Sequence, residues 1–276
     1  MRINPFVSLM VFLVLTGGVT RAETEGTLVI VGGGKMPADV RAEFFKLAGG
    51  KDRARLVVLP GASTAADDPK QHDSFVQSWR KLGPVSVQLL HTRDRKVADD
   101  PDFVKPLLEA TAVWMSGGDQ NRLIAAYSGT LLEKDLHKLL KRGGVIGGTS
   151  AGAAVMSELM IEGGNAEARM GPGFGFLKGI VVDQHFVARN RIGRVRGVLA
   201  KNKDYAGLGI DEGTAAIIRG QTLTIMGDST VTAIWSQSSS RPAKEQSLKA
   251  GEVLDLSSLR ATVETMPAAS VCPKRP

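Results

Sequence analysis

The chain alternates between short apolar segments and segments of helical periodicity from residue 27 to about residue 150. β-branched and apolar residues predict strands at residues 27–31, 55–60, 85–90, 112–115 and 144–147. The stretches between and after them predict helices at residues 40–48, 74–82, 103–110, 121–127 and 131–141. Such alternation predicts an α/β fold with a mostly parallel sheet and helices on both faces. Sites in such sheets lie at the carboxyl ends of the strands.

The pattern changes after residue 150. A helix is expected from Ala151 to Met160, and the glycine-rich stretch 163–179 is expected to be a long active-site loop. A strand is expected to end just before residue 183, and the part beyond Gly207 is β-rich. The strands expected there lie at residues 208–210, 215–218, 222–225, 231–235 and 251–256, with a polar loop at 236–242. Without an internal repeat or a clear linker, the sequence favours a single α/β domain over residues 23–262.

The first 22 residues are predicted to be a signal peptide. A basic start at Arg2 precedes an apolar run over residues 6–15, and Thr20 and Ala22 supply the small residues that a signal peptidase reads. The run is shorter than the roughly 20 residues that span a bilayer, so no stable membrane anchor is expected. We therefore expect a mature protein that is secreted or periplasmic.

Composition narrows the remaining function classes. The chain is 43% hydrophobic and 23% charged, which is ordinary for a globular protein. Cys272 is the only cysteine and lies in a tail, residues 263–276, that is expected to be disordered, so no intramolecular disulfide can form. The net charge is +7, but most lysines and arginines are interspersed with aspartates and glutamates along the chain. No nucleic-acid partner is therefore expected. No cluster has the spacing of metal ligands, so neither a metal nor another cofactor is expected.

Residues 148–152, with the sequence Gly-Thr-Ser-Ala-Gly, fit the pattern G-x-S-x-G. In that pattern a sharp turn between a strand and a helix exposes a nucleophilic hydroxyl, and the glycines allow close backbone packing. The pattern alone is weak, but an expected strand precedes it and an expected helix follows it. Ser150 is therefore the predicted nucleophile. The alternative is a tight turn without catalysis.

Gly117 and Gly118 follow the strand expected at residues 112–115. Glycines at a strand end leave their backbone N–H groups accessible. Together with the N–H of Ala151, one of them is predicted to form an oxyanion hole. The alternative is a plain turn before a helix that Asp119 caps.

The general base must be sought among four histidines, His72, His91, His137 and His185. His185 is favoured because it follows an expected strand and the glycine-rich stretch, whereas the others lie in polar or charged surroundings. Its acidic partner would be Asp211 or Glu212, which follow another short apolar strand. The residues alone leave that choice open.

Four arginines follow His185 within a few residues, at positions 189, 191, 194 and 196. Guanidinium groups bind carboxylates in bidentate geometry, so the cluster predicts recognition of an acidic substrate. The alternative is a basic helix face that provides solubility or binds nucleic acid.

The glycines at 32–34 match neither a dinucleotide-binding fingerprint nor a P-loop, and are interpreted as the first βα turn.

Four segments together resemble the cyanophycinases, in the serine peptidase family that also contains peptidase E, an aspartyl dipeptidase. These segments are Gly117-Gly118-Asp119-Gln120, residues 148–153, Asp183-Gln184-His185-Phe186 with the arginines at 189, 191 and 194, and residues 209–215. Their order and spacing match from about Thr27 to Leu256. The resemblance implies a fold similar to class I glutamine amidotransferases, with serine in place of cysteine. It also implies a catalytic triad, Ser150, His185 and Glu212.

The resemblance further implies an exopeptidase that cuts cyanophycin, a polyaspartate with arginine on each side chain, into β-Asp-Arg dipeptides. The partner would then be a peptide substrate rich in aspartate and arginine. The substrate-binding residues it implies are Gln120, Asp183, Gln184, Arg189, Arg191 and Arg194. In that site the arginines would hold substrate carboxylates.

The expected signal peptide departs from the enzymes that act on storage granules inside the cell. An exported enzyme would degrade polymer released by other cells, or another β-aspartyl peptide. One alternative is an α-aspartyl dipeptidase like peptidase E, and a second is a non-catalytic binding protein on an amidotransferase-like scaffold. A homodimer is compatible with the sequence, which does not determine the oligomeric state.

Overall fold

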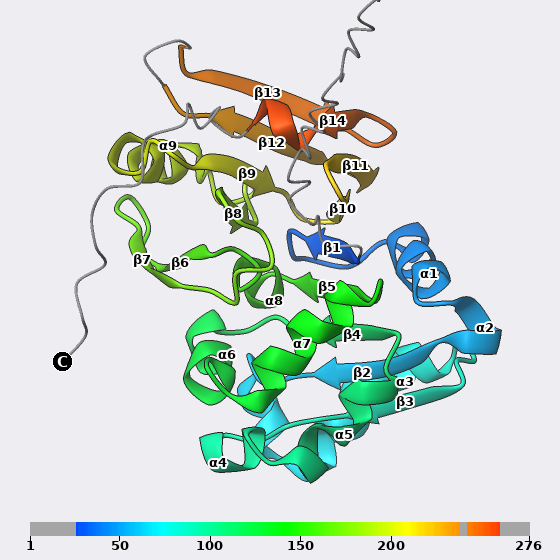
Figure 1. Cartoon of the computed structure of the whole chain (residues 1–276). Helices are drawn as coiled ribbons and strands as arrows, with labels where there is room; N and C mark the ends of the chain where they lie inside the picture. The colour runs from blue at the N-terminus through cyan, green and yellow to red at the C-terminus, as the bar shows by residue number, and fades with distance from the viewer. Residues whose placement is uncertain (1–25, 238–241, 260–276) are drawn as a thin grey trace, which may run out of the picture.

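The computed structural model describes residues 26–237 and 242–259 (Figure 1). The expected signal peptide at residues 1–22 and the expected tail at 263–276, with Cys272, lie outside these residues, as do both ends of the expected domain. Within the described ranges, no helix has both the length and the apolar character that crossing a membrane requires.

A large sheet of eight strands forms the centre of the molecule, in the order β14-β11-β10-β1-β5-β4-β2-β3. The parallel strands are β1 (Thr27–Val31), β2 (Arg55–Leu59), β3 (Ser86–Leu89), β4 (Ala112–Met115) and β5 (Val145–Thr149). The antiparallel strands are β10 (Thr214–Arg219), β11 (Thr222–Gly227) and β14 (Val253–Asp255). The predicted strands and their parallel arrangement in the first half of the chain are confirmed.

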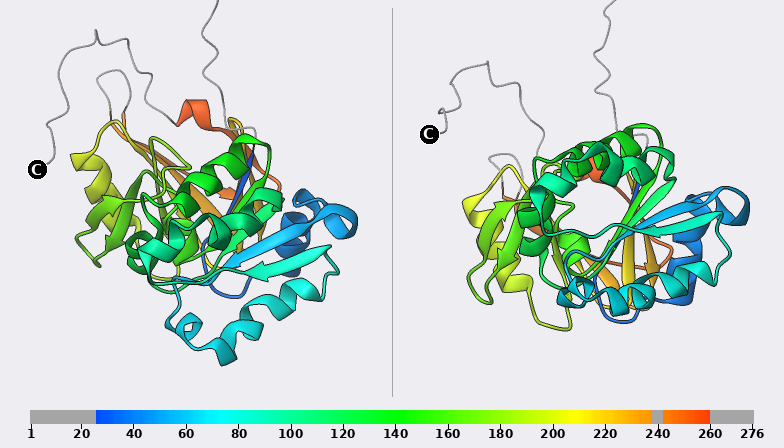
Figure 2. Two further views of the ribbon diagram at one scale, coloured as in Figure 1. Left: turned by 60° about the horizontal axis from the view of Figure 1, so that its bottom comes forward. Right: turned by 90° about the horizontal axis from the view of Figure 1, so that it is seen from below.

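Helices cover both faces of this sheet (Figure 2). On one face α1 (Ala38–Leu47) and α3 (His72–Arg80) bury apolar residues against alternate positions of the strands, and α2 (Gly50–Arg53) follows α1. Phe44, Trp79 and Trp114 meet there, with ring centroids 5.1–5.2 Å apart. The opposite face is covered by α4 (Arg95–Ala98), α5 (Pro101–Glu109), α6 (Gln120–Tyr127) and α7 (Leu131–Lys141). Successive side chains of a strand point to opposite faces of the sheet, so a strand that is apolar throughout contributes to the core on both faces.

A second sheet of four strands, in the order β13-β12-β9-β8, lies beside the first (Figure 1). It consists of β8 (Ile180–Gln184), β9 (Ala206–Ile210), β12 (Thr230–Trp235) and β13 (Lys244–Lys249). Helix α9 (Ile192–Lys201) packs on it through Val195, Val198 and Leu199. β8 and β9 are parallel, and residues 211–213 lead from β9 directly into β10 of the large sheet. The carboxyl ends of β8 and β9 are thereby held close to those of β1 and β5.

The helix expected from Ala151 to Met160 is wrong in length, because α8 spans only Ala151–Ala154. The backbone carbonyls of Val155 and Met156 accept hydrogen bonds from Phe174 N and Leu177 N, at 2.7 and 2.9 Å. A returning segment therefore uses the carbonyl groups that a longer helix would need.

The expected loop at residues 163–179 is also partly wrong. β6 (Leu159–Gly163) and β7 (Arg169–Pro172) form an antiparallel hairpin that includes its first half. Strand β13 was not predicted either, since it is an edge strand with exposed charged residues and has no apolar run.

Candidate active site

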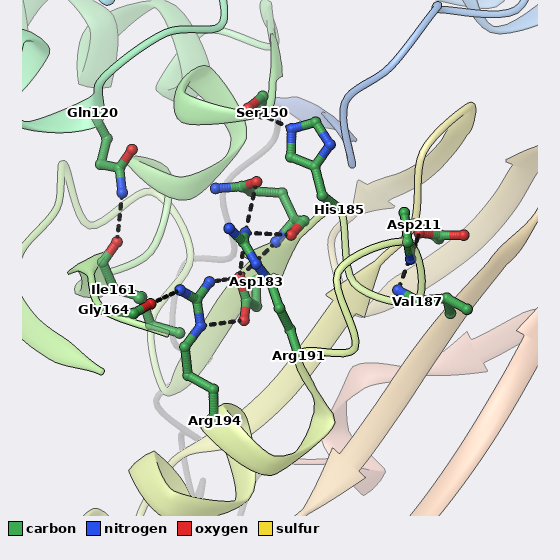
Figure 3. Close-up of polar contacts among 12 residues, drawn as sticks. Gln120, Ser150, Ile161, Gly164, Asp183, His185, Val187, Arg191, Arg194 and Asp211 are labelled. Carbon is green, nitrogen blue, oxygen red and sulfur yellow. Dashed lines mark hydrogen bonds and ion pairs between the residues drawn. The ribbon is translucent and has the colours of Figure 1, made fainter. Parts of the chain in front are cut away.

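Ser150, His185 and Glu212 come from three separate strand ends and meet in one line of hydrogen bonds. Ser150 follows β5, His185 follows β8 and Glu212 comes just after β9. The Oγ atom of Ser150 lies 2.9 Å from Nε2 of His185 (Figure 3), and Nδ1 of His185 lies 2.5 Å from Oε1 of Glu212. An imidazole between a hydroxyl and a carboxylate can accept the hydroxyl proton while its other nitrogen donates to the carboxylate.

The backbone at Ser150 adopts φ 53° and ψ −110°, a region that residues with a side chain rarely occupy. The N–H of Ser150 donates to the carbonyl of Val31 at 3.0 Å, which ties the turn to the neighbouring strand. A Cβ at Gly148 would lie 2.4 Å from the carbonyl oxygen of Gly152, and one at Gly152 would lie 2.4 Å from that of Met115. The two glycines are thus required by close backbone packing, as in a nucleophile elbow.

The two acidic residues after β9 occupy different places. Glu212 contacts the imidazole, and its side chain is 43% exposed. Asp211 is buried and instead accepts hydrogen bonds from the backbone N–H groups of Val187 and Ala188 and from the hydroxyl of Ser229, at 3.0, 2.9 and 2.8 Å. The structure therefore places Glu212, and not Asp211, against the ring of His185.

The carboxyl of Asp211 stays ionised although it is buried. Burial by itself raises its pKa, but the hydrogen bonds from Ala188, Ser229 and the neighbouring backbone outweigh this effect and hold the pKa below its usual value. The charge is thus stabilised by the donors that surround it.

The glycine pair after β4 lies beside the nucleophile. A Cβ at Gly117 would be 3.3 Å from Cβ of Ser150. Gly118 has φ 141°, and a Cβ there would be 2.2 Å from the carbonyl oxygen of Ala62, so this position requires glycine. Asp119 caps α6 by accepting from Asn121 N at 2.9 Å. Both interpretations of this segment thus agree with the geometry: it is a capped turn, and it is adjacent to Ser150.

Asp183 and Arg194 form a buried bidentate ion pair (Figure 3). Nε of Arg194 donates to Oδ2 of Asp183 at 3.0 Å, and Nη2 donates to Oδ1. The remaining Nη1 donates to the carbonyl of Gly164 in the β6–β7 hairpin. The pair therefore connects β8, α9 and the hairpin, and most of its hydrogen-bonding capacity is used within the protein.

Of the other predicted substrate-binding residues, Arg191 joins the same network. Its Nη1 donates to the backbone carbonyl and to Oε1 of Gln184, at 2.6 and 2.9 Å, and lies 3.3 Å from Asp183. Burial lowers the pKa of Arg191, and the charges of Arg194 and Arg189 act in the same direction, whereas Asp183 opposes them. Arg189 itself is exposed.

Gln120, at the start of α6, holds the hairpin from the other side. Its Nε2 donates to the carbonyl of Ile161 (Figure 3) and to that of Glu162, both at 2.9 Å. Arg196, the fourth arginine of the cluster, is instead paired with Glu245 at the surface.

Residues 28–226 match the model of peptidase family S51. This chain belongs to peptidase family S51. It is 33% identical over 226 residues to a cyanophycinase of Geminocystis herdmanii, an alignment that covers 78% of this chain and 82% of that protein. A cyanophycinase of Synechococcus elongatus is 36% identical over 224 residues, covering 76% of this chain and 68% of the relative. A solved peptidase from an acI-B1 actinobacterium matches with a TM-score of 0.66 and 24% identity, over 83% of this chain and 96% of that one.

These comparisons confirm three expectations. The resemblance to the family of cyanophycinases and the assignment as a serine-type peptidase follow from the family match and from the relatives. The structural likeness confirms the α/β fold of the class I glutamine amidotransferase type.

The glycine turn after β1 follows Val31 at the carboxyl end of a strand, where a site is expected, but the sequence predicts no role for its glycines beyond the first βα turn. His185 N donates to the carbonyl of Gly32 at 2.7 Å, and a Cβ at Gly33 would be 2.3 Å from Cε1 of His185. A Cβ at Gly34 would be 2.9 Å from Cβ of Glu212. The turn therefore packs directly against the imidazole and its carboxylate. The strand-end rule indicated this loop from the sequence, but which residues it contacts depends on the neighbouring strands.

The other histidines form contacts away from the three residues. The Nε2 atoms of His72 and His137 lie 2.9 and 2.8 Å from the carbonyls of Ala66 and Phe174, and that of His91 lies 2.9 Å from Asp67. In the part of the chain that the structure describes, no group of three histidine, cysteine or acidic side chains is arranged to hold a metal ion.

Proposed function

We propose that this peptidase is an exported exopeptidase that hydrolyses cyanophycin, or a related β-aspartyl peptide, to β-Asp-Arg dipeptides. The observation that carries the chemistry is the hydrogen-bonded series Ser150–His185–Glu212. The substrate class is supported by the two relatives named as cyanophycinases and by the cationic residues that follow His185.

In this mechanism Nε2 of His185 accepts the hydroxyl proton as Oγ of Ser150 attacks the scissile carbonyl carbon. The negative charge on the carbonyl oxygen is stabilised by the backbone N–H of Ala151 and that of Gly117 or Gly118. Glu212 stabilises the imidazolium, which then gives its proton to the leaving amine. A water molecule, deprotonated by His185, attacks the acyl-enzyme and releases the second product.

The substrate would bind beside the β6–β7 hairpin. A substrate that carries arginine side chains has both carboxylates and guanidinium groups. The exposed Arg189 and the partly buried Arg191 would bind carboxylates, with Gln184 next to them. Gln120, Asp183 and Arg194, which the resemblance also assigns to substrate binding, would support this site from behind, because all three are buried and bind the hairpin or each other.

The decisive experiment compares substrates. Purified protein without residues 1–22 is incubated with cyanophycin, with isoaspartyl dipeptides and with α-aspartyl dipeptides, and the products are identified by mass spectrometry. We expect β-Asp-Arg from cyanophycin and no product from the variant Ser150→Ala. Hydrolysis of α-aspartyl dipeptides alone would favour a peptidase E-like function, and a wild type that neither hydrolyses a substrate nor reacts with a fluorophosphonate would favour a binding protein.

Export is tested separately. The full-length chain is expressed in a bacterial host, and the intact mass is measured for protein from the cytoplasm, the periplasm and the medium. Cleavage after Ala22 gives a mature chain that begins at Glu23. An uncleaved chain that stays in the cytoplasm would contradict export and leave the chemistry of the peptidase unaffected.

A further inference from the structure

The turn that follows His185 has an unfavourable backbone, and beyond the buried Phe186 it has little apolar support. His185 has φ 51°, a left-handed conformation that is rare and unfavourable for a residue with a side chain. The next residue but one, Val187, has 57% of its surface exposed, and Ala188, Arg189 and Asn190 are exposed as well. Burial of these four side chains therefore does not hold the part of the turn beyond Phe186 in place.

Hydrogen bonds hold it instead, and two of them converge on one carboxylate oxygen. Oδ1 of Asp211 accepts from the N–H of Val187 at 3.0 Å and from that of Ala188 at 2.9 Å (Figure 3). On the other side of the histidine, His185 N donates to the carbonyl of Gly32 at 2.7 Å. The backbone is thus fixed both at His185 and immediately after it.

Asp211 is itself rigidly placed. It is only 8% exposed, its Oδ2 accepts from the hydroxyl of Ser229 at 2.8 Å, and its N–H donates to the carbonyl of Thr230 at 3.1 Å. β8 and β9 are parallel neighbours in which Gln184 pairs with Ile210, so Asp211 and His185 leave adjacent strands at the same level.

We propose that Asp211 is a positioning residue for His185: it fixes the turn after the histidine so that the imidazole reaches from Ser150 to Glu212. The two adjacent acidic residues thus have different roles. Glu212, with a half-exposed side chain, orients the ring through one hydrogen bond, and Asp211 orients the backbone that carries the ring. This inference rests on the proposed triad but not on the identity of the substrate.

The test compares Asp211→Ala with Asp211→Asn. Alanine leaves the N–H groups of Val187 and Ala188 without their acceptor, whereas asparagine keeps an oxygen at that position without the charge. The readout is the rate at which a fluorophosphonate labels Ser150, measured across a range of pH, because labelling needs the base but not the natural substrate. We expect labelling by the alanine variant to be at least about tenfold slower, which is less than the 10²–10⁴-fold that complete loss of a positioned base would cost.

The asparagine variant is expected to recover most of the labelling rate. In the alanine variant the labelling rate is expected to fall by a similar factor at every pH. The midpoint of its pH profile should stay where it is in the wild type. For peptide hydrolysis, kcat should fall while KM changes little, because substrate contacts remain.

Asp135→Ala is the matched control. Asp135 is also a buried acid, but it lies on α7 and its carboxylate binds Lys138 at 2.8 Å. This variant is expected to melt at a lower temperature and to be labelled at the wild-type rate. Ser150→Ala gives the background. If Asp211→Ala does not fold, Ser229→Ala must slow labelling instead, since it removes the hydroxyl that holds Oδ2.

Two outcomes would overturn the inference: labelling of folded Asp211→Ala at the wild-type rate, or an asparagine variant as slow as the alanine variant. A wild type that is not labelled at Ser150 would overturn it together with the triad. A wild type that is labelled but leaves cyanophycin intact would refute only the proposed substrate.

Discussion

Close backbone contacts around Ser150 make single glycines decisive. A Cβ at Gly152 would lie 2.4 Å from the backbone oxygen of Met115, an atom that cannot move without displacing β4. We expect Gly152→Ala to lower the free energy of unfolding by about 1–3 kcal/mol, the usual cost of overpacking, and to slow fluorophosphonate labelling of Ser150. Urea unfolding and labelling kinetics measure the two effects.

Gly197→Ala is the control for that substitution. Gly197 lies in α9 and a Cβ there would meet nothing within 4 Å. Alanine is favoured over glycine in a helix, so this variant should gain about 0.5–1 kcal/mol of stability and keep its labelling rate. A Gly152→Ala protein that matched this control in both measurements would refute the packing argument.

The buried charge of Asp211 predicts how stability depends on pH. Its pKa is lower in the folded protein than in the unfolded chain, so the unfolded state binds more protons as the solution becomes acidic. The contribution of the charge to stability is present above the ordinary pKa of aspartate, 3.8, and is lost as the pH falls through the lowered folded value.

The difference in unfolding free energy between wild type and Asp211→Asn should therefore be largest near neutral pH and shrink below pH 4, as urea unfolding at several pH values would show. A difference that stayed constant down to pH 2 would mean that the carboxylate is not stabilised by its donors.

The Asp183–Arg194 pair joins three elements of the fold, namely β8, α9 and the β6–β7 hairpin. Asp183→Ala leaves a buried guanidinium without its carboxylate, and we expect a loss of about 3–5 kcal/mol. The double variant Asp183→Ala/Arg194→Met should be more stable than that single variant, because it removes the unpaired charge as well. Urea unfolding of the variants measures the coupling.

The surface pair Arg196–Glu245 provides the comparison. Arg196 is largely exposed, so its replacement by alanine should cost less than about 1 kcal/mol. A double variant at 183 and 194 that was less stable than either single variant would contradict the expectation that the unpaired buried charge is what destabilises Asp183→Ala.

The elements differ in how far the sequence could predict them. β1, β2, β4 and α7 were predicted closely, because each has a local period or a continuous apolar run. α8 and β13 were not, for two different reasons. α8 ends early because Phe174 and Leu177, about twenty residues away, take the carbonyls that would continue it. β13 pairs with β12 at an edge, where exposed side chains leave no apolar signal.

On the scale of the whole molecule, the two sheets should unfold together. β9 continues into β10 through residues 211–213, and the glycine turn after β1 packs against His185 and Glu212 from the second sheet. The three tryptophans report on both parts: Trp79 and Trp114 pack on the large sheet, and Trp235 ends β12.

We expect a single urea transition in Trp235→Phe, whose remaining tryptophans report on the large sheet, and a single one in Trp79→Phe/Trp114→Phe, whose remaining tryptophan reports on the second sheet. In each variant, tryptophan fluorescence and far-ultraviolet circular dichroism should give one midpoint, as in a two-state domain. Two separate midpoints within one variant would contradict a single domain.

The candidate site shows what the sequence determined by itself. Ser150, the glycines around it and the short strands are local features, since they depend on a turn of five residues or on the side-chain period of one strand. The resemblance to cyanophycinases also came from the sequence, and with it the expectation of Ser150, His185 and Glu212 as partners. None of these needed knowledge of how distant segments pack.

The tertiary structure alone decided how the two neighbouring acids differ, that Arg194 and Asp183 bind each other, and that Gly33 lies against His185. Each of these depends on which strand ends are adjacent in space, and β1, β5, β8 and β9 are far apart in the sequence. The same local sequence pattern at a strand end is compatible with a residue that faces a ligand, an ion-pair partner or another backbone segment. Only the packing of the two sheets selects among these, because the contacts that distinguish them form between segments that are distant in the sequence.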